Sequence, residues 1–158
     1  MITVPPPAHQ PDFGGHGIAN LMASILEGLG EGGAAAPPCP ALPPDELAGR
    51  RTVVLMVLDG LGDLFLERRP DSFIARHRRA RLTAGFPTTT TTSITTILSG
   101  LAASEHALTG WFTWLRELGS VATVLPFMPR FGGATYEDLG VAPARILDAP
   151  PLAGRLTR

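Results

Sequence analysis

Apolar positions follow different periods in different parts of the chain. Between residues 17 and 29, apolar side chains recur at steps of three and four, which predicts one apolar face of a helix. Residues 52–58, with the sequence TVVLMVL, form an uninterrupted apolar run that is typical of a strand covered on both faces in a parallel sheet. Residues 121–125 predict a second strand. This alternation predicts an α/β fold with a mainly parallel sheet flanked by helices.

Glycine and proline separate these elements. Residues 28–33 read GLGEGG, formally a G-x-G-x-x-G pattern, but they follow a helix instead of a strand and lead into prolines. The context of a dinucleotide site is missing, so the pattern indicates the C-terminal cap of the first helix. We therefore expect an N-terminal part, residues 1–50, with an extended segment, a helix and a Pro/Ala-rich linker, followed by a second part, residues 51–158.

The stretch from residue 81 to Gly100 concentrates hydroxyl groups at an expected turn. Residues 81–84 predict a short strand, residues 85–87 break it, and five threonines at 88–92 lead into a helix that stops at Gly100. β-Branched threonine is a mediocre helix former, so helix propensity does not explain the run. Two interpretations stay open: a threonine caps the helix, or a hydroxyl held at the helix N-terminus attacks phosphorus or binds phosphate.

A carboxylate follows the apolar run directly. Asp59 comes after residues 52–58 and before a turn of small residues, Gly60-Leu61-Gly62. In open α/β sheets, sites lie beyond the carboxyl ends of the strands, which favours a functional role. A helix cap or a turn is an equally ordinary role for an aspartate at such a place.

Composition and charge bound the class of protein. With 158 residues, 44% of them apolar and 17% charged, the chain is long enough for one domain with a buried core. Its net charge of −1 gives no general attraction to nucleic acid or to anionic lipid, so we expect neither as a partner. All thirteen basic residues are arginines, and the absence of lysine excludes a Walker P-loop, a Schiff-base enzyme and a Ser-Lys hydrolase.

Cysteine usage and apolar run lengths indicate the compartment. Cys39 is the single cysteine, so it forms no internal disulfide, and a reducing compartment fits best. The longest apolar run, residues 53–58, is far below the roughly 20 residues that span a bilayer. Residues 1–15 lack the basic and apolar pattern of a secretion signal. We therefore expect a cytoplasmic protein.

Three segments between residues 51 and 125 read VVLMVLDGLGD, FPTTTTTSITTILSGL and SEHALTGW. Together they resemble the alkaline phosphatase superfamily, and within it the type I phosphodiesterase and nucleotide pyrophosphatase family. The resemblance implies a metal-dependent hydrolase of phosphoric esters with a small phosphodiester or nucleotide as substrate. It implies divalent metal ions as cofactors, two zinc ions in the first place, with manganese or magnesium as alternatives.

The resemblance also implies roles for individual residues. Asp59 matches the aspartate that ligates a metal at the end of the family's strand. The superfamily nucleophile stands ten residues before the glycine that closes the following helix, which points to Thr90 as nucleophile and metal ligand. Thr89 is a second candidate, because Gly85 replaces the threonine that precedes Phe-Pro in the nucleotide pyrophosphatases. Trp111 falls where that family has the asparagine beside the nucleophile and is the substrate-binding candidate, with one indole N–H donor.

The remaining ligands of a two-metal site have no match. The acidic and histidine residues after Thr90 form neither an Asp-x-x-x-His nor an Asp-His pattern, and they are Glu105, His106, Glu117, Glu137, Asp138 and Asp148. His106 lies in a Ser-Glu-His segment that resembles one with a conformational role in the family, so we do not expect it to ligate a metal. Because family members are more than twice as long as this chain, we expect it to be a truncated N-terminal portion of the catalytic domain. On its own, this portion should have almost no catalytic activity.

Two other classes compete with this interpretation. The first is a non-catalytic α/β module in which Asp59 caps a turn and the threonine run caps a helix. The second is a haloacid-dehalogenase-like phosphatase, which requires an aspartate two residues after Asp59. Position 61 is leucine, which strongly disfavours this second class.

Overall fold

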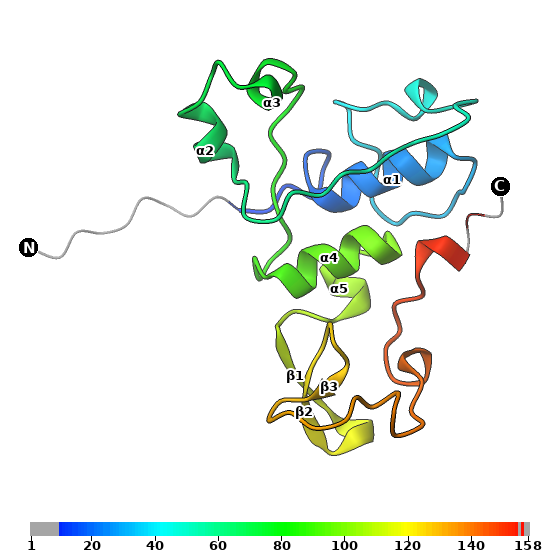
Figure 1. Cartoon of the computed structure of the whole chain (residues 1–158). Helices are drawn as coiled ribbons and strands as arrows, with labels where there is room; N and C mark the ends of the chain where they lie inside the picture. The colour runs from blue at the N-terminus through cyan, green and yellow to red at the C-terminus, as the bar shows by residue number, and fades with distance from the viewer. Residues whose placement is uncertain (1–9, 155, 157–158) are drawn as a thin grey trace, which may run out of the picture.

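The computed structural model describes residues 10–154 and residue 156, so residues 1–9 of the expected N-terminal segment lie outside it. Figure 1 shows α1, α4 and α5 in the middle, with α2 and α3 on one side and a small sheet on the other. The helices are α1 (Ile18–Gly28), α2 (Asp63–Glu67), α3 (Phe73–Arg76), α4 (Thr90–Ser99) and α5 (Ala103–His106), and the strands are β1 (Phe112–Leu115), β2 (Ser120–Thr123) and β3 (Met128–Pro129). None of the described helices is long and apolar enough to cross a membrane.

The first predicted helix is confirmed by α1. Its apolar face is buried against α4, where Met22 and Leu26 are almost inaccessible to solvent. The buried Asn20 fixes its start, because the Asn20 Oδ1 accepts a hydrogen bond of 2.9 Å from the Gly17 amide. The Asn20 Nδ2 donates to two loop carbonyls, so this side chain also attaches the flanking loops to the helix.

Both long helices end at glycines with left-handed backbone angles. After α1, Gly30 has a φ of 86° and the Glu31 amide donates to the Leu26 carbonyl at 2.9 Å, which confirms the expected C-terminal cap. The threonine run opens α4, and Gly100, with a φ of 74°, closes it through a 2.8 Å hydrogen bond to the Thr96 carbonyl. The predicted limits of the second helix are therefore confirmed.

Two separate apolar clusters form the core. The first joins α1 to α4 and to the 3-10 turn η4 (Leu152–Gly154), and its buried members are Met22, Ile25, Leu26 and Leu152. The second lies beside the β1–β2 hairpin, and its buried members are Leu115, Ala122, Phe127 and Tyr136. No residue of α2 or α3 is buried, so the lobe of these two helices adds little to the core.

Ion pairs hold that lobe. Asp63 at the start of α2 pairs with Arg78 at 2.9 Å and with Arg81, and Arg79 pairs with Glu46 at 2.8 Å. Arg78 and Arg79 are exposed, and both are paired. Exposed pairs contribute only about 0–1 kcal/mol each, so the lobe is weakly attached compared with α1 and α4.

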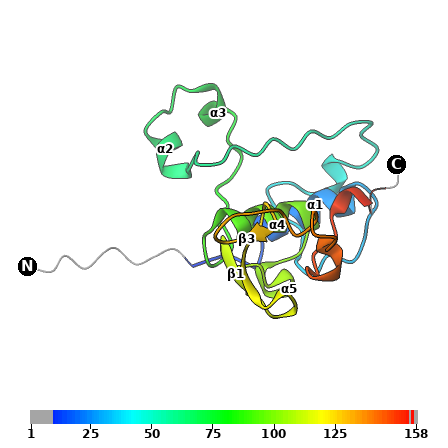
Figure 2. The ribbon, with the colours of Figure 1, turned by 60° about the horizontal axis from the view of Figure 1, so that its bottom comes forward.

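The expected strand at residues 52–58 is not formed in the described part of the chain. These residues run extended, as Figure 2 shows for the long trace that leads to α2, but they pair with no strand. Val54 is 79% exposed and Met56 74% exposed. An apolar, β-branched run favours a buried strand only where neighbouring strands and helices cover it, and the described residues supply no such neighbours.

The sheet is antiparallel and lies elsewhere. Residues 121–125 overlap β2, so the second predicted strand is confirmed, and β2 pairs with β1 and β3 in the order β1-β2-β3. A short turn joins β1 to β2, and strands joined in this way are antiparallel. Among the described residues, parallel pairing is limited to one isolated bridge between Gly17 and Thr83. Thr83 lies in the expected strand at 81–84, which is otherwise not formed. The described residues therefore form an α/β structure without the mainly parallel sheet expected from the apolar runs.

Replacing Gly100 by alanine tests the packing of α4. The positive φ alone should lower the free energy of unfolding by about 1–2 kcal/mol. The loss should be larger, because the new Cβ would lie 2.8 Å from the Leu26 Cδ1. Gly119→Ala is the matched control, since Gly119 has a φ of 58° and its new Cβ would meet nothing within 4 Å. Equal losses in urea unfolding of the two variants would contradict the role of the Leu26 contact.

Candidate functional site

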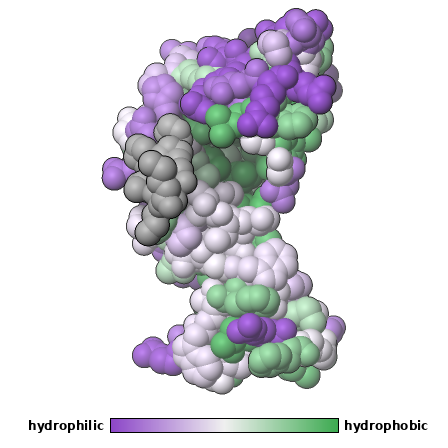
Figure 3. Space-filling model, turned by 90° about the vertical axis from the view of Figure 1, so that its left-hand side faces the viewer, coloured by the Kyte–Doolittle hydropathy of each residue, from purple (hydrophilic) through white to green (hydrophobic). Residues whose placement is uncertain are grey.

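A cleft of about 500 Å³ lies between the end of the extended segment and the first turns of α4. Figure 3 shows a hollow with hydrophobic residues on this side of the molecule, beneath the more hydrophilic lobe of α2 and α3. Its lining comprises Ile18, residues 57–62, Ala84, residues 88–90, Ser93, Ile94 and Ile97. The cleft brings together Asp59 and Thr90, which lie 31 residues apart in the sequence.

Asp59 stands at the turn that ends the extended segment. The turn depends on Gly60, whose φ of 73° is one that other residues rarely adopt. The Asp59 carboxylate is exposed and takes part in none of the ion pairs among the described residues. It does not cap α2, because the N-cap position of that helix is Gly62. The side chain is therefore available to the cleft.

Thr90 is the first residue of α4, and its side chain is exposed at the cleft. The hydroxyl makes no hydrogen bond with another described side chain or carbonyl, in contrast to that of Thr89. The backbone amides of Thr90 and Thr91 likewise have no acceptor within the described part of the chain. A ten-residue helix with free first-turn amides favours an anion at this end.

The Thr89 hydroxyl is occupied by structural hydrogen bonds. It accepts from the Thr92 amide at 3.2 Å, which makes Thr89 the N-cap of α4. It donates to the Thr109 carbonyl at 3.2 Å and lies 2.9 Å from the Thr92 hydroxyl. An oxygen engaged in this way is less available for attack than the one on Thr90, so the two candidates occupy different environments.

Whereas Ser93 lines the cleft, five of the remaining hydroxyl side chains of α4 form a buried polar face that sequence reasoning missed. Its members are Thr91, Thr92, Thr95, Thr96 and Ser99. Their spacing of one, four, five and eight residues from Thr91 is helical, and this period was the available signal. Most have partners; for example, the Ser99 hydroxyl donates to the Thr95 carbonyl at 2.7 Å. The Thr91 Oγ1 is buried without a hydrogen-bond partner among the described residues.

His106 on α5 belongs to this buried face. Its Nδ1 accepts from the Leu108 amide at 3.0 Å, so in the neutral ring the proton is on Nε2, 3.2 Å from the Thr96 hydroxyl. Burial lowers the pKa of His106 below its ordinary value of 6.5, although Glu105 and two backbone groups act in the opposite direction. The side chain therefore joins α5 to α4 and does not face the cleft.

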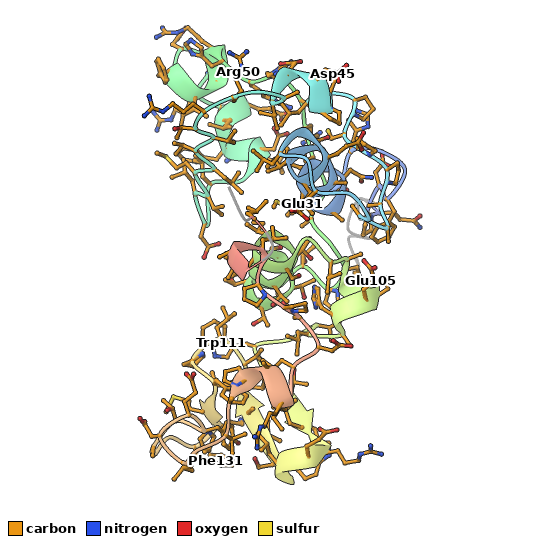
Figure 4. The ribbon with its side chains drawn as sticks, turned by 90° about the vertical axis from the view of Figure 1, so that its right-hand side faces the viewer. Glu31, Asp45, Arg50, Glu105, Trp111 and Phe131 are labelled. Atoms are coloured by element: carbon orange, nitrogen blue, oxygen red, sulfur yellow. The ribbon has the colours of Figure 1, made fainter. Side chains whose placement is uncertain are left out.

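Trp111 lies outside the cleft. It is 45% exposed, it precedes β1, and its carbonyl accepts a hydrogen bond of 3.0 Å from the Val124 amide. Figure 4 shows it between the helical middle of the molecule and the β-sheet. Trp111 is two residues after Thr109, whose carbonyl accepts a hydrogen bond from the Thr89 hydroxyl. It does not line the cleft with Asp59 and Thr90.

The donor set at the cleft fits part of a metal coordination shell. Asp59 and Thr90 offer a carboxylate and a hydroxyl oxygen, both accepted by zinc, manganese and magnesium. No group of three or more His, Cys, Asp or Glu residues that could hold a metal ion occurs in the described part of the chain. A catalytic zinc uses about three protein ligands, and the cleft offers two such donors among the described residues.

Comparison with known proteins returned nothing: no family model matches the chain, and neither the curated proteins nor the solved structures gave a match.

The buried His106 should make the protein less stable in acid. Since its pKa is lower in the folded than in the unfolded chain, the unfolded chain takes up the proton first, and stability should fall as the pH decreases below about 6.5. Urea unfolding at pH 7.5 and pH 5.5 measures this loss. In His106→Gln the loss of stability should be smaller, because glutamine does not take up a proton. The other histidines are unchanged in this variant. An equal pH dependence in both proteins would contradict a buried neutral imidazole.

Proposed function

We propose that the chain carries the nucleophile-bearing part of a metal-dependent hydrolase of phosphoric esters, of the phosphodiesterase or nucleotide pyrophosphatase type. Thr90 is the nucleophile and Asp59 is a metal ligand. The supporting observation is that Thr90 and Asp59, from distant parts of the sequence, line one cleft and are exposed. Among the described residues, the Thr90 hydroxyl has no hydrogen-bond partner and the Asp59 carboxylate forms no ion pair. The mainly parallel sheet of the resembling superfamily belongs to this proposal, with residues 52–58 as one of its strands.

The chain's own residues would bind the phosphoryl group and attack its phosphorus. The free amides in the first turn of α4 favour the phosphoryl oxygens of a small phosphodiester or nucleotide. The Thr90 oxygen then attacks phosphorus, the alcohol or phosphate leaves, and water hydrolyses the phosphothreonine ester. A divalent metal ion, when bound, lowers the pKa of such a hydroxyl and neutralises the phosphoryl charge.

A non-catalytic module is the second candidate function. Two observations favour it: Thr89 caps α4, and five of the hydroxyl side chains on this helix are buried in packing. Under this alternative, the run of threonines is explained by capping and packing alone. Thr90 and Asp59 would then be solvent-exposed residues without a shared ligand, so the two functions differ in what a metal ion does at the cleft.

A manganese titration followed by NMR separates the two functions. Paramagnetic Mn²⁺ reports weak binding, so it suits a site with two protein donors. We expect selective broadening of the amide signals of residues 59–61 and 89–91, because one ion would contact Asp59 and Thr90 together. Asp59→Asn should abolish the broadening at residues 89–91, and the matched control Asp148→Asn, at an exposed carboxylate outside the cleft, should not. Broadening at residues 59–61 alone would support the non-catalytic module.

Stability and turnover should separate Thr89 from Thr90. Thr89→Ala should lower the free energy of unfolding by about 1 kcal/mol through loss of the cap, whereas Thr90→Ala should change it by less than about 0.5 kcal/mol. With saturating zinc or manganese, we expect turnover of bis(p-nitrophenyl) phosphate near background, since the described residues supply too few ligands. Any turnover above background should disappear in Thr90→Ala and persist in Thr89→Ser. Turnover that survives Thr90→Ala would contradict the nucleophile assignment.

A further inference from the structure

The extended segment before the cleft, residues 51–59, pairs with no other described segment along either of its edges. No backbone amide or carbonyl from residue 51 to residue 59 makes a hydrogen bond with another described residue. All five apolar side chains from Val54 to Leu58 are at least 42% exposed, which is rare for adjacent large apolar residues. An uncharged, β-branched run of this kind without proline readily pairs with another strand.

The charges at the ends of the segment select one pairing. Arg51 precedes the apolar run and Asp59 follows it, each four residues from Leu55. If two copies of the segment pair antiparallel around Leu55, Arg51 of each copy stands opposite Asp59 of the other. Opposite charges facing each other across an antiparallel pair are stabilising, and like charges are destabilising. A parallel pairing in register would instead place arginine beside arginine and aspartate beside aspartate.

We propose that residues 51–59 form the interface of a two-fold homodimer, in which the segments of two copies pair antiparallel with Leu55 at the two-fold axis. The occupant of the open edge is a second copy of this chain. Two-fold pairing along one edge uses the same surface on both copies and closes at two, while the outer edge of each segment stays unpaired. A two-stranded ribbon alone is marginally stable in water, so the exposed side chains of Val54 and Met56 must contribute to the contact.

Cysteine cross-linking tests the register. In the proposed pair, residue 55 lies opposite itself at a Cα separation of about 4.5–5.5 Å, which a disulfide can bridge. Leu55→Cys should therefore form a covalent dimer on mild oxidation. Val53→Cys and Val57→Cys should not link by themselves, but a mixture of the two should link. The native Cys39 is buried and stays in place.

Phe131→Cys is the control for random collision, because Phe131 is 94% exposed and lies outside the segment. Linking of Leu55→Cys no faster than of this control would overturn the proposal. Self-linking of Val53→Cys and Val57→Cys would show a parallel pair and overturn it as well. Far-UV circular dichroism confirms that each variant keeps its helices.

A charge exchange tests the Arg51–Asp59 pairs independently of cysteine. Sedimentation of the unmodified chain should show a monomer–dimer equilibrium. Arg51→Glu should weaken dimerisation about tenfold, because two like-charge pairs replace two opposite-charge pairs. Asp59→Arg should weaken it similarly, and the double variant should restore it.

Three outcomes of sedimentation would overturn the dimer: a monomer at all concentrations, growth into open polymers, or a double variant no better than the single ones. These measurements read association and not metal binding or turnover. Because a metal ion at the cleft and Arg51 of the second copy would use the same Asp59 carboxylate, sedimentation is carried out without divalent metal ions. Loss of the dimer and loss of manganese binding are then measured separately.

Discussion

The fold depends on the attachment of α4 to the loop that follows α5. The Thr89 hydroxyl donates to the Thr109 carbonyl, the Thr92 hydroxyl lies within reach of the Leu108 carbonyl, and His106 contacts Thr96. Each such hydrogen bond contributes about 0.5–1.5 kcal/mol, but leaving one of these buried groups without a partner costs more. Hydroxyls at helical spacing therefore fix α4 against this loop on one side, while its apolar residues pack against α1 on the other.

This attachment also decides which threonine faces the cleft. The cap requires the Thr89 oxygen to point at the helix backbone, and packing turns five later hydroxyl side chains inward, whereas Ser93 stays at the cleft. Thr90 lies between them on the exposed side of the first turn, beside the free amides. Capping and chemistry are thus not alternatives for the run as a whole, because neighbouring threonines have different environments.

The extended segment shows how an apolar run depends on its surroundings. Its composition favours a buried strand, yet no described strand pairs with it, and the hairpin of β1 and β2 forms from residues close in sequence. Local pairing needs only a short turn, whereas parallel pairing needs a crossover and further strands. The run ends at Asp59 in the cleft, so whatever pairs with this segment also lies next to the candidate site.

The sequence alone determined the elements whose information is local. The period of apolar residues located α1, the glycines located the ends of α1 and α4, and the apolar residues at 121–125 located β2. Only the tertiary structure decided that Thr89 is the cap and Thr90 is open, that His106 is buried against Thr96, and that Trp111 lies away from Asp59. Each of these depends on which distant segments meet, and neither periodicity nor turn chemistry encodes the partner of an apolar face or of a hydroxyl. The same holds for residues 52–58, because burial on two faces is a property of the neighbours of a strand and not of its own residues.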